Sequence, residues 1–98
     1  MVWESPGASQ PDAIVEIYTW RSCPFCLRAK TLLERKAIPF REYCIDGDES
    51  ARREMARRAN GRSSVPQIFI NNVSIGGCDE LHALERRGQL EAFVGGQG

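Results

Sequence analysis

A proline between two cysteines, in the run Cys23-Pro24-Phe25-Cys26, is the feature that most restricts how this chain can fold. Proline has a fixed φ and no backbone N–H, so it suits the first turn of an α-helix, where that N–H would have no partner. The stretch before it, 13–19, is apolar on both faces and is typical of a covered central strand. The sequence therefore predicts a strand up to Thr19 and a helix from Pro24 to about Lys36, with the first cysteine at their junction.

The rest of the chain is predicted to alternate between strands and helices. Asp48 suits a helix N-cap, Asn60-Gly61 a helix end, and Asn71-Asn72 a two-residue hairpin turn. Two strand–helix–strand crossovers predict parallel pairing, and the last hairpin must be antiparallel. The expected class is α/β, a mixed four-stranded sheet flanked by three helices in the order β-α-β-α-β-β-α. The further elements are expected as strands over 40–45, 67–70 and 73–75 and as helices over 49–60 and 79–87.

Length and charge restrict the possible functions. The chain has 98 residues, enough for one domain, which we expect over 13–95 after a flexible leader at 1–12. Its 13 basic and 13 acidic residues balance, which argues against nucleic acid or an anionic membrane as a partner. No apolar run approaches the roughly 18 residues of a membrane helix, and no secretory signal is recognisable, so we expect a cytoplasmic protein. Four arginines are expected to form a solvated helix face, with a basic docking patch as the alternative: Arg52, Arg53, Arg57 and Arg58.

Four cysteines could form a disulfide framework, hold a metal or act in redox chemistry. A disulfide framework is typical of secreted chains. A structural zinc site usually needs two close pairs of ligands, and Cys44, Cys78 and His82 stand singly, although Cys78 and His82 could share a helix face. We therefore expect no metal and interpret Cys44 as a small buried apolar residue. The Cys-x-x-Cys spacing of Cys23 and Cys26 then indicates a redox-active pair.

The start of a helix favours the thiolate form of Cys23, which is the form that attacks disulfides. Unpaired N–H groups and the helix dipole stabilise negative charge there, and Arg21 could add a positive charge. Cys26 is close enough to form a disulfide with Cys23 and should be more buried, because it lies inside the helix. We therefore expect Cys23 to attack and Cys26 to resolve the mixed disulfide.

Three separated segments resemble the glutaredoxin family: Cys23-Pro24-Phe25-Cys26, Ser64-Val65-Pro66 and Gly76-Gly77-Cys78-Asp79. The similarity covers Ile14 to about Phe93, and segment 43–48 resembles dithiol members from bacteria and cyanobacteria. The resemblance implies a thioredoxin-like fold and a monomeric enzyme that reduces protein disulfides and glutathione mixed disulfides. It also implies glutathione as the reductant and glutathione reductase as an indirect partner.

The resemblance further implies a glutathione site built from distant segments. Pro66 would be cis, and the backbone of Val65 would pair with the cysteine of glutathione. The helix start from Gly77 to Asp79 would bind the γ-glutamyl carboxylate, and Asp79 would pair with the ammonium. A plain strand start at Val65-Pro66 and a plain helix cap at Asp79 are the alternatives. The implied glutathione contacts are Arg21, Pro24, Phe25, Arg62, Ser64, Val65, Pro66, Gly77, Cys78 and Asp79.

Trp20 stands where many members of the family have a lysine that meets the glycyl carboxylate of glutathione. We therefore expect Arg62 to bind that carboxylate, with help from Arg21. Trp20 would line the substrate groove or cover the edge of the core. Two related functions stay open, an iron–sulfur cluster held through Cys23 and glutathione, and direct reduction by a flavoprotein reductase.

Overall fold

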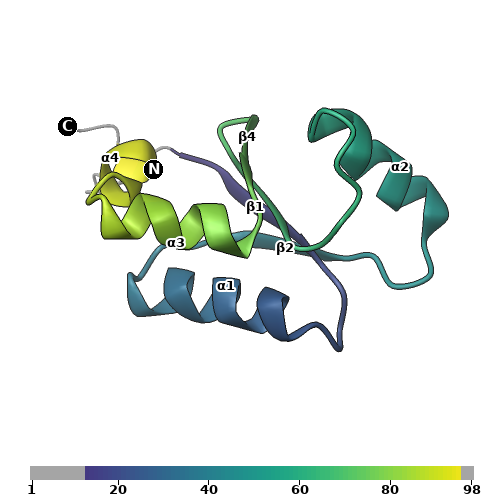
Figure 1. Cartoon of the computed structure of the whole chain (residues 1–98), viewed down its shortest axis with the longest axis horizontal. Coiled ribbons are helices and arrows are strands. Elements are labelled where there is room, and N and C mark those ends of the chain that lie inside the picture. Colours follow the sequence, from purple (N-terminus) through teal and green to yellow (C-terminus); the bar gives the residue numbers. More distant parts are fainter. Residues whose placement is uncertain (1–12, 96–98) are drawn as a thin grey trace, which may run out of the picture.

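The computed structural model describes residues 13–95, so the leader predicted at 1–12 lies outside the described residues. This part of the chain forms a sheet with helices around it (Figure 1). The predicted elements are all present near their expected bounds, and α4 is an addition to the three helices expected. The elements are β1 Val15–Thr19, α1 Pro24–Arg35, β2 Arg41–Cys44, α2 Glu49–Arg58, β3 Gln67–Ile70, β4 Val73–Gly76, α3 Cys78–Arg86 and α4 Leu90–Gly95.

The strand order across the sheet is β2-β1-β3-β4. β1 and β2 are parallel, but β3 runs antiparallel to β1 and β4 antiparallel to β3. The parallel pairing predicted for the second crossover is therefore wrong. Thr19 pairs with Cys44 where β1 and β2 end, and β3 begins opposite Tyr18. The chain thus re-enters the sheet at the end where it left, because α2 lies beyond that end instead of spanning the sheet (Figure 1).

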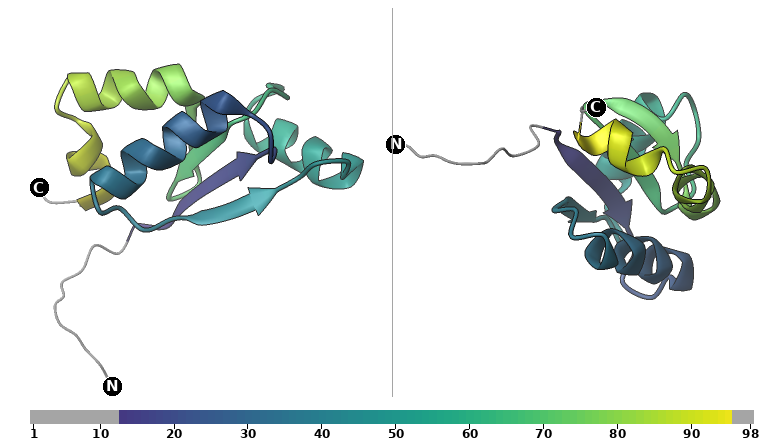
Figure 2. Two further views of the ribbon diagram at one scale, coloured as in Figure 1. Left: turned by 90° about the horizontal axis from the view of Figure 1, so that it is seen from below. Right: turned by 90° about the vertical axis from the view of Figure 1, so that its left-hand side faces the viewer.

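Helices α1 and α3 lie on one face of the sheet (Figure 2), and α2 packs against the other face near its end, through Tyr18 and Phe69. Side chains alternate along β1, so Val15 and Ile17 face the main core beneath α1 and α3, while Tyr18 faces a smaller core beneath α2. β3 alternates in the same way, with Phe69 toward α2. β1 is therefore buried on both faces, as predicted, and β3 is buried in the same way. None of the helices in the described part of the chain is long and apolar enough to cross a membrane.

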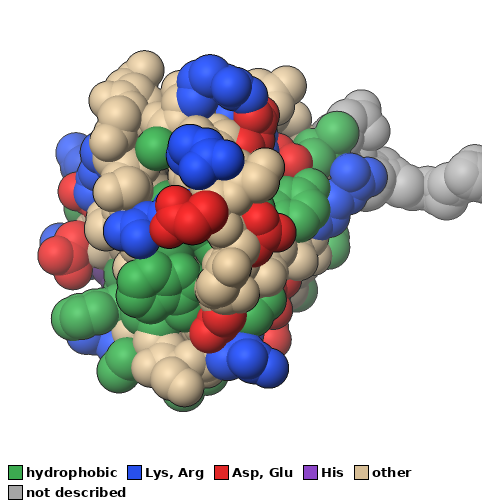
Figure 3. Space-filling model, turned by 90° about the vertical axis from the view of Figure 1, so that its right-hand side faces the viewer, with side chains coloured by type: hydrophobic (Ala, Val, Ile, Leu, Met, Phe, Trp, Pro, Cys, Tyr) green, Lys and Arg blue, Asp and Glu red, His purple; other side chains and the backbone are tan. Residues whose placement is uncertain are grey.

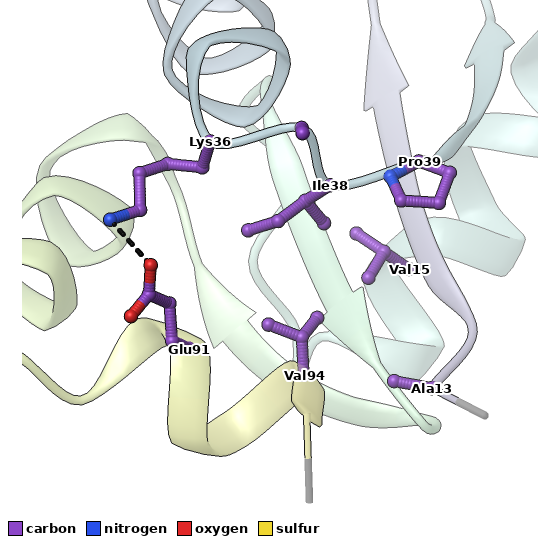
Figure 4. Close-up of a pocket in the computed structure, with 8 residues that line it drawn as sticks. Ala13, Val15, Lys36, Ile38, Pro39, Glu91 and Val94 are labelled. Carbon is purple, nitrogen blue, oxygen red and sulfur yellow. Dashed lines mark ion pairs between the residues drawn. The ribbon is translucent and has the colours of Figure 1, made fainter. Parts of the chain in front are cut away.

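The unpredicted helix α4 closes the main core at the end opposite the start of α1 (Figure 1). Leu90 and Val94 are four residues apart and both are buried in that core. Figure 4 shows the shallow pocket that remains beside them, about 240 Å³ in volume, where the Lys36 ammonium lies 2.9 Å from Glu91. The sequence interpretation stopped at Gly88, a typical helix end, and the helix that follows has only 6 residues.

Arg58 corrects the prediction that all four arginines of α2 form a solvated face. Its guanidinium lies 4.2 Å from the centre of the Phe69 ring. It donates hydrogen bonds to Glu16 at 2.7 Å and to the Tyr18 hydroxyl at 2.8 Å. The aromatic rings give the cation a flat surface on which to pack, and Glu16 supplies the opposite charge. Arg58 therefore ties α2 to β1 and β3.

Candidate active site

Cys23 stands at the junction of β1 and α1, as the sequence predicted. It is the N-cap residue of α1, with an extended backbone, and Pro24 is the first residue of the helix. Its Sγ accepts a hydrogen bond from the Cys26 N–H at 3.4 Å. The sulfur thus takes the place of a capping oxygen and faces N–H groups that have no partner within the helix. The side chain is partly exposed, so a substrate can reach it.

Cys26 faces the core from the same helix. Only 1% of its surface is exposed. This burial, together with the neighbouring Cys23 sulfur, raises the pKa of Cys26 to about 12. A low-dielectric environment opposes the charged form of a thiol. The two sulfurs therefore differ as predicted, since one is accessible at a helix start and the other is a buried thiol.

A groove of about 190 Å³ runs beside Cys23 and gathers most of the residues predicted to contact glutathione. The peptide bond between Val65 and Pro66 is cis, as predicted. The Sγ of Cys23 lies 3.9 Å from the Val65 carbonyl oxygen, so this turn sits against the accessible sulfur. The groove therefore joins segments that are far apart in sequence. It is lined by Phe25, Arg62, Ser64, Val65, Pro66, Gly77, Cys78, Asp79 and Glu80.

Glu80 is a groove residue that the sequence interpretation missed. Its Oε1 accepts a hydrogen bond from the Gly77 N–H at 2.7 Å and lies 3.6 Å from the Arg62 guanidinium. The Gly77 N–H and the nearby Arg62 charge hold the pKa of Glu80 below its usual range. A glutamate at the third helical position commonly accepts the N–H of the N-cap residue. The spacing from Gly77 to Glu80 was therefore the signal available in the sequence.

Two glycines allow the start of α3 to approach the cis turn. A Cβ on Gly76 would lie 2.8 Å from Cγ of Glu80, and the φ of Gly76 is +114°. A Cβ on Gly77 would lie 3.1 Å from the carbonyl oxygen of Pro66. Gly76 therefore requires a residue without a side chain, and a side chain at position 77 would need the cis turn to shift by a few tenths of an ångström.

The structure separates the two arginines that were expected to share one carboxylate. Arg62 lines the groove, and its side chain is about half exposed beside Glu80. Arg21 is 81% exposed, lies 3.9 Å from Asp46 and lines a different pocket. Arg62 therefore lines the groove in which an anion could bind, and Arg21 does not line it.

A second pocket, of about 350 Å³, also borders Cys23. Trp20 contributes to it with a ring that is 40% exposed and that lies 5.7 Å from the Arg52 guanidinium. Trp20 thus lines a surface pocket beside the sulfur and does not line the groove of the cis turn, so its role toward substrate stays a prediction. Figure 3 shows this end of the molecule, where hydrophobic side chains gather among charged ones. The pocket is lined by Trp20, Arg21, Ser22, Cys23, Pro24, Cys26, Leu27 and Lys30.

The other two cysteines differ in exposure. Cys44 is exposed, contrary to the prediction, because β2 is an edge strand, and its thiol donates a hydrogen bond to Asp46 at 3.0 Å. Cys78 is buried at the start of α3, and this burial raises its pKa. Its sulfur lies 3.4 Å from Nδ1 of His82, so these two side chains share a helix face. Within residues 13–95, no three His, Cys, Asp or Glu side chains gather as a metal-binding group.

Comparison with known proteins connects this geometry to a family. The sequence model of the glutaredoxin family matches residues 15–75. A probable glutaredoxin of Synechocystis sp. is 62% identical over 88 residues, which cover 87% of this chain and 81% of that protein. Glutaredoxin 3 of Escherichia coli is 54% identical over 82 residues, covering 84% of this chain and 98% of that protein. The solution structure of glutaredoxin from Brucella melitensis is similar with a TM-score of 0.74 and 46% identity, covering 84% of this chain and 88% of that one.

Proposed function

The chain belongs to the glutaredoxin family and is therefore a glutathione-dependent thiol–disulfide oxidoreductase, in which we propose that Cys23 is the nucleophile and Cys26 the resolving thiol. The accessible Cys23 thiolate attacks one sulfur of a substrate disulfide. A bond forms between the Cys23 sulfur and that sulfur while the disulfide of the substrate breaks. The other substrate sulfur leaves as a thiolate and takes up a proton. A mixed disulfide on Cys23 is the product of this step.

Two routes then release the rest of the substrate. In the first, Cys26 attacks the Cys23 sulfur, which yields a Cys23–Cys26 disulfide and a second substrate thiol. Two glutathione molecules afterwards reduce this disulfide and leave as oxidised glutathione. In the second route, the mixed disulfide contains glutathione itself, and a free glutathione attacks it without help from Cys26. Reduction of a protein disulfide thus uses both cysteines, and removal of glutathione uses only Cys23.

The groove beside Cys23 is our proposed glutathione site. The carbonyl and N–H of Val65 would pair with the cysteine of glutathione. The sulfur of that cysteine would then face Cys23, whose own Sγ lies 3.9 Å from the Val65 carbonyl oxygen. N–H groups at the start of α3 would bind the γ-glutamyl carboxylate, with Asp79 beside its ammonium. Arg62 would meet the glycyl carboxylate. The convergence of the cis turn, the start of α3 and the accessible sulfur carries this proposal.

Separate substitution of the two cysteines tests this division of roles. We expect Cys26→Ser to retain reduction of a glutathionylated protein with glutathione and to lose reduction of a protein disulfide. Cys23→Ser should lose both activities, and Cys44→Ser is the matched control because that thiol lies outside both pockets. Loss of deglutathionylation in Cys26→Ser, in a variant that unfolds like the wild type, would contradict the mechanism.

We further propose a cytoplasmic monomer that needs no resident metal and receives electrons from glutathione reductase through glutathione. A reducing compartment keeps the glutathione pool and these thiols reduced. Two thiols and glutathione complete the exchange chemistry without a metal.

A further inference from the structure

Lys30 lies on the same face of α1 as the resolving thiol. Cys26 and Lys30 are four residues apart, a spacing that brings helix side chains to about 5–6 Å between their Cβ atoms. Both line the second pocket, together with Cys23. The Lys30 side chain is only 27% exposed. A half-buried ammonium therefore borders the pocket that contains both active-site cysteines.

One hydrogen bond holds this ammonium, and a second holds the carboxylate that accepts it. Glu42 of β2 accepts from Nζ of Lys30 at 2.9 Å, and the same carboxylate oxygen accepts from the Thr19 hydroxyl at 2.7 Å. Thr19 is fully buried at the end of β1. The bond to Glu42 raises the pKa of Lys30, and the Thr19 hydroxyl, with Lys30, lowers the pKa of Glu42. Lys30 is therefore an ammonium at neutral and mildly alkaline pH.

The resolving step creates charge where burial opposes it. Cys26 must become a thiolate to attack, yet its side chain is buried in the protein. Cys23 has the N–H groups of the helix start to stabilise its charge, whereas Cys26 lies inside the helix. Lys30 is the cation that follows Cys26 by one turn and lines the same pocket, while Glu42 does not line it. Of the two members of the ion pair, the positively charged one therefore borders the pocket that contains the thiol.

We propose that Lys30 stabilises the thiolate of Cys26 during the resolving step and that Glu42 and Thr19 position Lys30 for this role. The inference rests on the dithiol mechanism proposed above. In this step Cys26 gives its proton to solvent, its sulfur bonds to Sγ of Cys23, and the bond between Cys23 and the substrate sulfur breaks. The departing substrate thiolate takes up a proton. The two cysteines are thereby oxidised to a disulfide and the substrate is reduced to a thiol.

Other charged groups near Lys30 set the conditions of the test. Glu34 of α1 attracts the Lys30 ammonium, and Arg21 of the preceding loop lines the same pocket. The sulfur of Cys23 carries no charge while it is part of a mixed disulfide. Glu34 and Arg21 are unchanged in the variants below, so a difference between variants reports the Lys30 charge.

A single-turnover reaction with dithiobis(nitrobenzoate), an aromatic disulfide, separates the two steps. Attack by Cys23 releases one coloured aromatic thiolate, and attack by Cys26 releases a second from the mixed disulfide. Cys44→Ser serves as the background because that thiol is exposed and would also react. On this background, Cys26→Ser defines the signal of the first step alone. The variants to compare are Lys30→Gln, Lys30→Arg and Lys36→Gln.

We expect Lys30→Gln to slow the second release by roughly three- to tenfold and to move its pH profile toward higher pH. Each unit by which the pKa of the Cys26 thiol rises reduces its thiolate fraction about tenfold. The thiolate of a thiol with a higher pKa is a stronger nucleophile, which restores part of the rate. Lys30→Arg should recover most of the rate. Lys36→Gln is the matched control, because Lys36 is an ion-paired lysine at the other end of α1. It should leave both releases unchanged.

The outcomes separate this inference from the proposed function. A second release in Lys30→Gln at the wild-type rate and with the wild-type pH profile would overturn the role of Lys30. Equal slowing in Lys36→Gln, or no recovery in Lys30→Arg, would also overturn it, because the effect would then be structural. Absence of any second release in the Cys44→Ser background would instead contradict the dithiol mechanism.

Discussion

Single residues decide the environment of each active-site sulfur. Cys23 caps α1 and is accessible, and Cys26 lies one turn later on the buried face of the same helix. A shift of three positions therefore converts a surface thiol into a buried one whose pKa is raised. In the groove, Glu80 connects two of the lining residues. Its carboxylate accepts a hydrogen bond from the Gly77 N–H and lies beside the Arg62 guanidinium.

Substitution of Arg62 tests the anion site of the groove. We expect Arg62→Ala to raise the KM for glutathione by roughly tenfold, since a charge-assisted hydrogen bond to a carboxylate is worth about 1.5–3 kcal/mol and this site is half exposed. The kcat at saturating glutathione should change little, because Arg62 does not touch the reacting sulfurs. Steady-state kinetics with varied glutathione measure both values. Arg53→Ala, at an exposed arginine of α2, is the control, and an unchanged KM in Arg62→Ala would remove Arg62 from the site.

The elements differ in how well local sequence specifies them. The strand before Pro24, α1 and the Asn71-Asn72 hairpin follow from residues next to one another and were predicted. The direction of β3 was predicted wrongly, because it depends on where α2 lies relative to the sheet. α2 in turn is attached through Arg58, which packs on Phe69 and bonds to Glu16, and the charge pattern of its helix gave no sign of this. Prediction thus failed where a tertiary contact decides the outcome.

Removal of the Arg58 side chain should destabilise the attachment of α2. We expect Arg58→Ala to lower the free energy of unfolding by about 2–3 kcal/mol, because it leaves the half-buried Glu16 carboxylate without its cation. Arg57→Ala is the matched control, since Arg57 is an exposed neighbour on the same helix whose ion pair should contribute less than about 1 kcal/mol. Urea unfolding measures both changes. Equal effects of the two substitutions would contradict the anchoring role.

The same network should make part of the stability depend on pH. Burial raises the pKa of Glu16, but the hydrogen bonds from Arg58 and Tyr43 outweigh it, so its pKa in the folded protein is below the ordinary value. The unfolded chain therefore binds more protons, and the contribution of Glu16 is present above about pH 4.3 and lost as the pH falls through its lowered pKa. We expect the difference in unfolding free energy between wild type and Glu16→Gln to shrink on acidification. A constant difference from pH 7 to about pH 2 would contradict this.

At the scale of the whole molecule, the site forms where three segments meet at one end of the sheet. β1 ends there, the cis turn leads into β3 there, and α3 begins beside that turn. The family resemblance predicted most of the groove residues. Two of the predicted contacts, Arg21 and Pro24, line the second pocket instead, and the resemblance gave no reason to expect Glu80. The exposure of Cys44 was also missed, because the position of β2 at the sheet edge depends on the strand order.

The central claim, that the accessible thiol at the start of α1 is the nucleophile, can be tested by trapping the mixed disulfide. Reduced Cys26→Ser is incubated with oxidised glutathione, and peptide mass spectrometry locates the glutathione that the chain acquires first. We predict that it lies on Cys23 and that added free glutathione removes it. A first adduct on Cys44 or Cys78, with Cys23 unmodified, would contradict the account.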